Sequence, residues 1–243
     1  MPSYAGGKGQ AGIYQQIICQ FPPHAVYIEP FLGGGSIMRY KKPAARSIGI
    51  DLDPAAIAAL SDDRWGEVRP GSHAVSADGT RSSIEVICTD ALAFLRDYTW
   101  QGTELVYCDP PYLLETRSSK RPIYACEFGS SEQHSALLEL LSSIPAMVAI
   151  SGYWSSLYAT MLQSWRTISF PAVRRSGKLA TEWLWMNYPE PQALHDYQFL
   201  GNGFRERERI QRKIKRWSHR IEKMPRLERL AMLAALEHRQ NER

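Results

Sequence analysis

The stretch Glu29-Pro30-Phe31-Leu32-Gly33-Gly34-Gly35-Ser36 decides the fold class. It follows a short apolar strand predicted at residues 25–29 and leads into a helix predicted from Ser36. Glycines let the chain turn tightly and bring its backbone close to a ligand. Asp51 ends the next predicted strand, at about the 20-residue separation where Rossmann-like sites place an acid that binds ribose hydroxyls. Together, these features predict a site for a nucleoside-containing cofactor.

The glycine turn also excludes two common nucleotide-binding classes. After Gly33 and Gly35, Met38 occupies the place of the third glycine in the G-x-G-x-x-G pattern, so a nicotinamide-dependent oxidoreductase is the weakest alternative. The chain has no G-x-x-x-x-G-K-[ST] segment, which argues against an ATPase.

The rest of the chain alternates short apolar strands with amphipathic helices. This alternation implies β-α-β crossovers, so we predict an α/β fold with a mostly parallel seven-stranded sheet and helices on both faces. Polar, glycine-bearing residues 64–83 predict a loop or a small insertion. The predicted strands are residues 25–29, 46–51, 84–88, 104–108, 146–151, 166–170 and 181–187.

A second informative stretch, Asp109-Pro110-Pro111-Tyr112, follows the predicted strand at residues 104–108. Ligands of open parallel sheets bind at the carboxyl ends of the strands. The two prolines stiffen the turn and remove N–H donors. Asp109 and the Pro110 carbonyl can accept both hydrogens of a planar exocyclic amine, and Tyr112 offers an aromatic face to a flipped base. The turn therefore predicts a nucleobase amine as the target.

The basic character of the chain is concentrated at its end. Residues 201–243 contain 13 Lys/Arg and 6 Asp/Glu, whereas the remaining residues contain 16 and 19. We therefore predict two parts, a main domain at residues 1–200 and a basic helical C-terminal extension at residues 201–243, the latter suited to a polyanionic partner or simply solvated. Pro225 divides the extension, and its apolar stripe predicts docking to the main domain or, less favoured, dimerisation: Leu227, Leu230, Leu233 and Leu236.

Composition narrows the setting further. No apolar run approaches the ~20 residues of a membrane span, and no apolar segment follows the N-terminal residues, so we expect no membrane association and a cytoplasmic location. The histidines are scattered and the cysteines form no C-x-x-C pair, so we expect no metal. Cys88 and Cys108 stand in apolar runs, which predicts buried reduced thiols.

Several motifs resemble those of the Dam-like adenine-specific DNA methyltransferases, and they occur along the chain in the same order as in that family. The resemblance is strongest to the short forms carried by phages and prophages. The resemblance spans residues 4–187. The matching segments are Tyr4-Ala5-Gly6-Gly7-Lys8, the loop from Glu29 to Ser36, Asp51, Asp90, the turn from Asp109 to Tyr112, Ser151-Gly152-Tyr153, and residues 181–187.

The resemblance implies a Rossmann-like methyltransferase fold with S-adenosylmethionine as cofactor, S-adenosylhomocysteine as product, no metal, and DNA as partner of a monomer or homodimer. The implied catalytic residues are Asp109, Pro110 and Tyr112. The implied cofactor contacts are Tyr4, Gly7, Lys8, Glu29, Phe31, Gly33, Gly35, Asp51, Asp90, Ala91 and Asp109. The expected nucleic-acid contacts are Tyr112, Arg117, Lys120, Arg121 and Tyr124, and Phe128 is a further candidate wall of the target pocket.

The expected reaction is a direct in-line displacement onto the adenine 6-amino group, in which Asp109 and the Pro110 carbonyl favour the pyramidal nitrogen of the transition state. Larger members of the family place a recognition domain between the ribose acid and the catalytic turn. Here only residues 52–108 lie between them, which predicts short or relaxed sequence specificity. Adenine in RNA, a cytosine 4-amino target, and a catalytically inactive DNA-binding protein remain the alternatives.

Overall fold

A computed structural model describes residues 8–9, 12–61, 73–75, 81–117, 126–173 and 179–241. The chain forms two compact units, Met1–Tyr197 and Gln198–Arg243. Each is described by itself.

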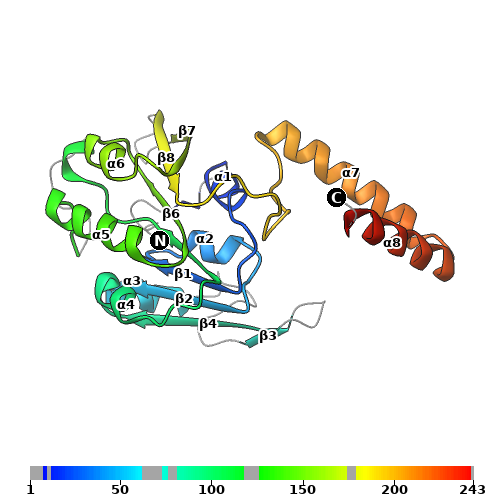
Figure 1. The fold of residues 1–243 in the computed structure, drawn as a ribbon, viewed down its shortest axis with the longest axis horizontal. Coiled ribbons are helices and arrows are strands. Elements are labelled where there is room, and N and C mark those ends of the chain that lie inside the picture. Colours follow the sequence, from blue (N-terminus) through cyan, green and yellow to red (C-terminus); the bar gives the residue numbers. More distant parts are fainter. Residues whose placement is uncertain are drawn as a thin grey trace. The chain divides into compact units, whose positions relative to one another are not determined.

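The first unit is built on one eight-stranded sheet, in the order β3-β4-β2-β1-β5-β6-β8-β7 (Figure 1). The order reverses beside β1, which creates a topological switch point between β1 and β5, where open α/β sheets bind ligands. The strands are β1 (Val26–Pro30), β2 (Arg46–Asp51), β3 (His73–Val75), β4 (Arg81–Cys88), β5 (Glu104–Cys108), β6 (Met147–Gly152), β7 (Arg166–Val173) and β8 (Leu179–Met186).

Strands β4, β2, β1, β5 and β6 pair in parallel, whereas β8 pairs antiparallel with both β6 and β7. The mostly parallel seven-stranded Rossmann-like sheet expected from the sequence is thereby confirmed. The eighth strand, β3, pairs antiparallel with the beginning of β4. Both lie within residues 64–83, where the sequence predicted a loop or a small insertion, and they form a short strand pair there. This strand pair lies at the edge of the sheet and contains polar residues such as Ser82 and Ser83, so it lacks the apolar pattern by which strands are predicted.

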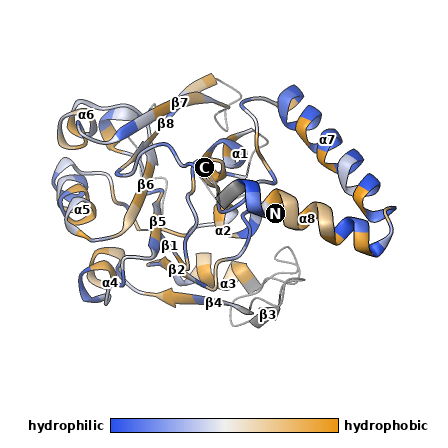
Figure 2. Ribbon diagram, turned by 45° about the vertical axis from the view of Figure 1, so that its right-hand side comes forward, coloured by the Kyte–Doolittle hydropathy of each residue, from blue (hydrophilic) through white to orange (hydrophobic). Residues whose placement is uncertain are grey.

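The helices of the first unit cover both faces of the sheet, as Figure 2 shows. On one face lie α4 (Ala91–Asp97), α5 (Ser131–Ser143) and α6 (Ser156–Met161). On the other lie α1 (Ile13–Ile18), α2 (Ser36–Tyr40) and α3 (Pro54–Ala58), followed by a 3-10 turn at Ala59–Ser61. A second 3-10 turn, Leu114–Thr116, follows the Asp109–Tyr112 turn.

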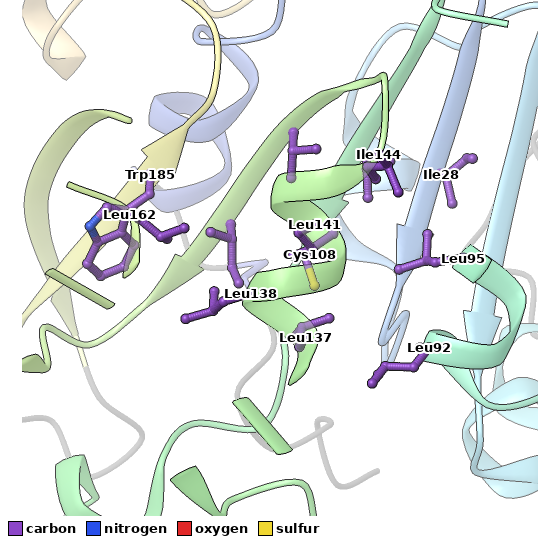
Figure 3. Close-up of a cluster of buried hydrophobic side chains, with 14 of the residues drawn as sticks. Ile28, Leu92, Leu95, Cys108, Leu137, Leu138, Leu141, Ile144, Leu162 and Trp185 are labelled. Carbon is purple, nitrogen blue, oxygen red and sulfur yellow. The ribbon is translucent and has the colours of Figure 1, made fainter. Parts of the chain in front are cut away.

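The core between the sheet and the α4–α6 layer is formed by apolar side chains that are almost entirely buried (Figure 3). Leu137, Leu138 and Leu141 recur at helical spacing, so α5 directs one apolar stripe at the strands. The side chain of Cys108 is buried in this cluster, as predicted. The prediction for Cys88 was wrong: it is exposed, because it is the last residue of β4 at the carboxyl edge of the sheet.

Side-chain caps fix where two helices begin beside the carboxyl edge of the sheet. Asp53 accepts a hydrogen bond from the backbone of Ala55 at the start of α3, and Asp90 accepts one from Ala93 at the start of α4. Asp and Asn side chains are strongly preferred at such positions because they satisfy backbone N–H groups that no helical carbonyl reaches. The caps therefore hold the segments after β2 and β4 at the site end of the sheet.

The second unit contains two helices, α7 (Phe204–Glu222) and α8 (Arg226–Asn241). Pro225 lies between them, and the chain turns there so that α8 diverges from α7 (Figure 2). The four leucines of the α8 stripe are exposed to between 43 and 79%. Within the described part of the chain, no helix is long and apolar enough to cross a membrane.

Candidate active site

One cavity of about 510 Å³ opens at the carboxyl edge of the sheet, around β1, β2 and β5. It collects all the described residues that the sequence predicted for the cofactor and the catalytic turn. These are Lys8, Glu29, Phe31, Gly33, Gly35, Asp51, Asp90, Ala91, Asp109, Pro110 and Tyr112. Residues from five separate stretches of the chain thus line a single space.

The glycine turn forms one wall of this cavity through left-handed backbone conformations. Gly33 and Gly35 have φ values of 50° and 58°, which glycine adopts at little cost. Phe31 also has a positive φ, 61°, although it carries a side chain. Such strain in a bulky residue is uncommon and persists where the surroundings enforce it. Here the Phe31 ring packs against Phe128, with ring centroids 5.0 Å apart.

Asp51, the last residue of β2, ties two loops of the site together. Its Oδ2 accepts a hydrogen bond from the Gly33 backbone N–H at 2.6 Å, and its Oδ1 accepts one from Asp53 N–H at 2.9 Å. The residue is buried but still lines the cavity. Because a carboxylate oxygen has two lone pairs, each oxygen can accept a further hydrogen bond from a ligand hydroxyl.

Glu29 is a buried carboxylate on the floor of the cavity. Its Oε2 accepts hydrogen bonds from the Tyr27 hydroxyl at 2.8 Å and from the Met38 backbone N–H at 2.9 Å. Burial raises the pKa of Glu29 to about 8, even though these two hydrogen bonds favour the charged form. The cation of Lys41 also favours the charged form of Glu29, and a cationic group in the cavity would favour it further.

Asp109 is held from two sides. Lys8 donates a hydrogen bond to Asp109 Oδ1 at 2.6 Å, and the Ser151 hydroxyl donates to the same oxygen at 3.0 Å. Because the Ser151 hydroxyl donates its hydrogen to Asp109, it can only accept from the Tyr107 hydroxyl. Tyr107 therefore donates to Ser151 Oγ, at 2.9 Å. The hydrogen bonds found among the described residues converge on Oδ1, which leaves Oδ2 available to an incoming amine.

Lys8 joins this turn to β8. The Lys8 side chain is buried beneath the turn, with its ammonium 4.9 Å from the centroid of the Tyr112 ring. Burial alone would lower the pKa of Lys8, but the charges of Asp109 and Glu182 raise it well above the ordinary value. Lys8 is therefore protonated throughout the physiological pH range.

Tyr112 supplies an aromatic wall and is itself fixed in place. Its hydroxyl donates to the carboxylate of Glu182, at 3.0 and 3.2 Å from the two oxygens, and its ring lies 4.4 Å from that of Tyr153. Burial, reinforced by the carboxylates of Glu182 and Asp109, raises the pKa of Tyr112 well above its ordinary value. The phenol therefore remains protonated.

His134, from α5, supports the catalytic turn from behind. Its Nε2 lies 3.1 Å from the carbonyl oxygens of both Pro111 and Phe128, so this nitrogen carries the proton and donates. The Tyr158 hydroxyl, 2.8 Å from Nδ1, then donates to the ring. Burial lowers the pKa of His134 to about 4, so the ring is neutral at pH 7 and links the turn to the segment that carries Phe128.

Arg117 differs from its predicted role as a nucleic-acid contact. It does not line the cavity, and its side chain is 4% exposed. The guanidinium donates to the carbonyl of Tyr112 at 2.6 Å and to Glu127 at 2.8 Å. In this structure Arg117 therefore braces the turn. Five other predicted residues lie outside the described part of the chain: Tyr4, Gly7, Lys120, Arg121 and Tyr124.

The structure brings to the site several residues whose roles were not predicted from the sequence. Glu182 and Ser151 stood in the later matching segments, but nothing in their local pattern indicated contact with Lys8 and Asp109. Leu52, which directly follows Asp51, lines the cavity and is half exposed, which is unusual for a large apolar side chain. Phe128, predicted as a candidate wall, does line the cavity. In the described residues, no cluster of His, Cys, Asp or Glu could hold a metal ion.

Several solved structures are similar in fold to this chain. The N-methyltransferase NodS of Bradyrhizobium japonicum WM9 aligns with 74% of this chain and 93% of its own at 12% identity and a TM-score of 0.46. TrmK of M. capricolum, solved with S-adenosyl-homocysteine, aligns with 94% of this chain and 95% of its own at 9% identity and a TM-score of 0.45. The 23S rRNA methyltransferase ErmE aligns with 76% and 70%, at 15% identity and a TM-score of 0.43.

A family model gives the more specific finding. Residues 74–172 match the model of the D12 class N6 adenine-specific DNA methyltransferases. The matched segment contains β4, α4, β5, the turn from Asp109 to Tyr112, α5 and β6. The resemblance to this family found in the sequence is confirmed over this segment, which includes the Asp109–Tyr112 turn.

Proposed function

We propose that the protein transfers a methyl group from S-adenosylmethionine to the exocyclic 6-amino group of adenine in DNA. One observation carries the proposal: the glycine turn, three acidic residues and the Asp109–Tyr112 turn line a single cavity at the switch point of the sheet. The family match over residues 74–172 supports adenine in DNA as the target.

The residues along the cavity fit this cofactor from end to end. Asp51 is the acceptor for ribose hydroxyls, and the Asp90-Ala91 segment at the start of α4 faces the adenine edge. The backbone of Phe31–Gly35 holds the methionine portion. Glu29, a buried carboxyl group whose pKa is raised to about 8, would be the partner for its ammonium. When bound, the cofactor supplies a methyl group activated by its sulfonium.

Asp109 and Pro110 orient the target amine. Lys8 and Ser151 donate to Asp109 Oδ1. The Asp109 Oδ2 oxygen and the Pro110 carbonyl would each accept one hydrogen of the amine, which would leave its nitrogen lone pair free to take the methyl group. Positive charge develops on this nitrogen as the new bond forms, and the fixed carboxylate of Asp109 stabilises it. The surplus proton leaves to Asp109 or to water. Tyr112 provides the face on which the base stacks, a contact worth ~1–3 kcal/mol.

The basic second unit is the proposed contact to the phosphate backbone. In α7, Arg209, Lys213, Arg216 and Arg220 recur at spacings of three and four residues and so share one side of the helix. We call these four residues the basic stripe. Phosphate contacts of this kind add affinity without reading sequence. With only residues 52–108 between Asp51 and the turn, we expect short or relaxed specificity and a cytoplasmic enzyme that acts as a monomer or homodimer.

A side-by-side assay tests the choice of polymer. Purified protein with labelled S-adenosylmethionine is offered DNA duplex, single-stranded DNA and RNA of the same sequence, each containing every dinucleotide. The proposal expects N6-methyladenine in DNA, with transfer to RNA at least tenfold slower. Transfer predominantly to RNA, or a cytosine product, would reject the proposed substrate. Sequencing of the methylated DNA would reject relaxed specificity if it showed a long, strict motif.

A further inference from the structure

A buried cation separates two carboxylates beneath the catalytic turn. Lys8 Nζ lies 2.6 Å from Asp109 Oδ1 and 3.2 Å from Glu182 Oε1. The side chains of Lys8 and Glu182 are 5% and 4% exposed, whereas that of Asp109 is 17% exposed because it faces the cavity. Glu182 does not line the cavity, so it reaches the reacting groups only through its neighbours.

Hydrogen bonds close these residues into one network. Lys8 also donates to the Tyr112 hydroxyl, and that hydroxyl donates onward to Glu182. The three hydrogens of the ammonium thus meet Asp109, Tyr112 and Glu182. We call these four residues the Lys8 cluster. Since all three ammonium hydrogens are committed in the protein, Lys8 acts here through its charge and its position.

The charge balance of the Lys8 cluster bears on catalysis. Lys8 paired with Asp109 alone would be neutral overall, and the ammonium would oppose the positive charge that develops on the target nitrogen. Glu182 adds the second negative charge. We propose that Glu182 is a positioning residue of the transfer reaction that neutralises Lys8, so that Asp109 keeps its full negative charge toward the target amine. This inference rests on the proposed function.

The electrostatics of the surrounding groups agree with this assignment. Three titratable groups bear on Glu182: Lys8 lowers its pKa, Asp109 raises it, and the Tyr112 hydroxyl lowers it through a hydrogen bond. Burial is the largest influence and leaves the pKa of Glu182 raised. Lys8 in turn faces the Tyr107 hydroxyl as well as the two carboxylates. Lys8 and Glu182 therefore each favour the charged form of the other.

The test removes the charge of Glu182 and then that of Lys8. Glu182→Gln keeps the shape but leaves Lys8 to offset Asp109, and kcat should fall about tenfold or more, with KM for the cofactor changed less than about threefold. Adding Lys8→Met removes the excess cation. The double variant should therefore recover at least about half of the drop in log kcat that Glu182→Gln causes. Glu85→Gln, at an exposed ion pair with Arg46, is the matched control and should leave kcat unchanged.

Two results would overturn the inference: unchanged kcat in Glu182→Gln, or a double variant no more active than Glu182→Gln. If Glu182→Gln alone does not fold, Lys8→Met is compared with the double variant. Once Lys8 is absent, loss of the Glu182 charge should change kcat less than about threefold, and a tenfold drop contradicts the inference.

A second measurement separates this inference from the proposed function. Urea unfolding of the wild type, both single variants and the double variant gives the coupling between Lys8 and Glu182 without any methyl transfer. If the two single effects were additive, they would predict an unfolding constant for the double variant. The measured unfolding constant should be smaller than this prediction by about tenfold or more. Additive effects would refute the charge pairing. Transfer to neither DNA nor RNA by wild-type protein would refute the proposed function, while this coupling still tests the pair.

Discussion

The carboxylate of Asp51 accepts a hydrogen bond from the backbone N–H of Gly33 at 2.6 Å, which joins the end of β2 to the glycine turn that follows β1. The same carboxylate also accepts from Asp53 N–H at 2.9 Å. A residue expected to hold ribose is thus also the clamp that shapes the turn for the methionine portion of the cofactor. Binding of the two halves of the ligand should therefore depend on one side chain.

Asp51→Ala is expected to weaken binding of S-adenosylhomocysteine by about tenfold or more, because hydrogen bonds to a charged group contribute ~1.5–3 kcal/mol. The free energy of unfolding should also fall by ~1–3 kcal/mol, since two backbone N–H groups lose their acceptor. Titration calorimetry and urea unfolding measure the two effects. Asp97→Ala, outside the cavity, is the control. Affinity within twofold of wild type would refute the role of Asp51.

The backbone strain at Phe31 can be isolated with a pair of variants. Phe31→Ala and Phe31→Gly both remove the ring that packs on Phe128, so both should weaken cofactor binding. Only glycine relaxes the positive φ of 61°. The free energy of unfolding should therefore be ~1 kcal/mol higher for Phe31→Gly than for Phe31→Ala. Equal stability of the two, or a more stable alanine variant, would contradict the strain.

The sequence predicts the parallel sheet and the residues of the cofactor cavity because both depend on local patterns. Apolar runs mark β1, β2 and β5, and the glycine turn and the catalytic turn directly follow two of them. The topology then brings these turns together, since parallel strands end at one edge of a sheet. For this reason Asp51 and Asp109 could be assigned to one site before any contact was known.

What the sequence missed depends on pairing between distant segments. β3 and the beginning of β4 are polar and stabilise each other only through edge pairing. Glu182 lies 174 positions after Lys8, and no local pattern indicates that β8 delivers its carboxylate to that lysine. Arg117 stands in a basic segment that looks like a nucleic-acid contact, but its guanidinium folds inward onto the Tyr112 carbonyl. In each case a tertiary contact overrides the local pattern.

The raised pKa of Glu29 predicts a pH dependence of stability. Burial raises this pKa to about 8 in the folded protein, above its value in the unfolded chain. The folded state thus binds the extra proton, so the free energy of unfolding should decline as pH rises from about 4.5 to 8, by on the order of 5 kcal/mol from this group. Glu29→Gln should lack this decline. Denaturant unfolding at several pH values measures the difference, and parallel curves for the two proteins would contradict the assignment.

The basic stripe of α7 predicts a salt-dependent contribution to DNA binding. Lys213 and Arg216 are exposed, and replacing both with Gln should weaken binding to every sequence alike. The slope of log affinity against log salt concentration should decrease by about 2, because each lost phosphate contact contributes ~0.9. Fluorescence anisotropy across a salt series measures the slope. Gln substitutions at Glu206 and Glu208 on the same helix are the control, and equal slopes for wild type and the basic double variant would rule out the contact.

Methyl transfer by Asp109→Ala tests the central claim most directly. Wild-type protein and the variant receive labelled S-adenosylmethionine and the same adenine-containing DNA duplex, and the product is digested to nucleosides. The variant should first be shown to bind S-adenosylhomocysteine, so that lost transfer reports on the amine and not on folding. We predict N6-methyladenine with the wild type and a rate at least about 100-fold lower with Asp109→Ala, because an oriented acceptor for the developing charge is gone. An undiminished rate with Asp109→Ala, or label on another nucleoside, would contradict the account.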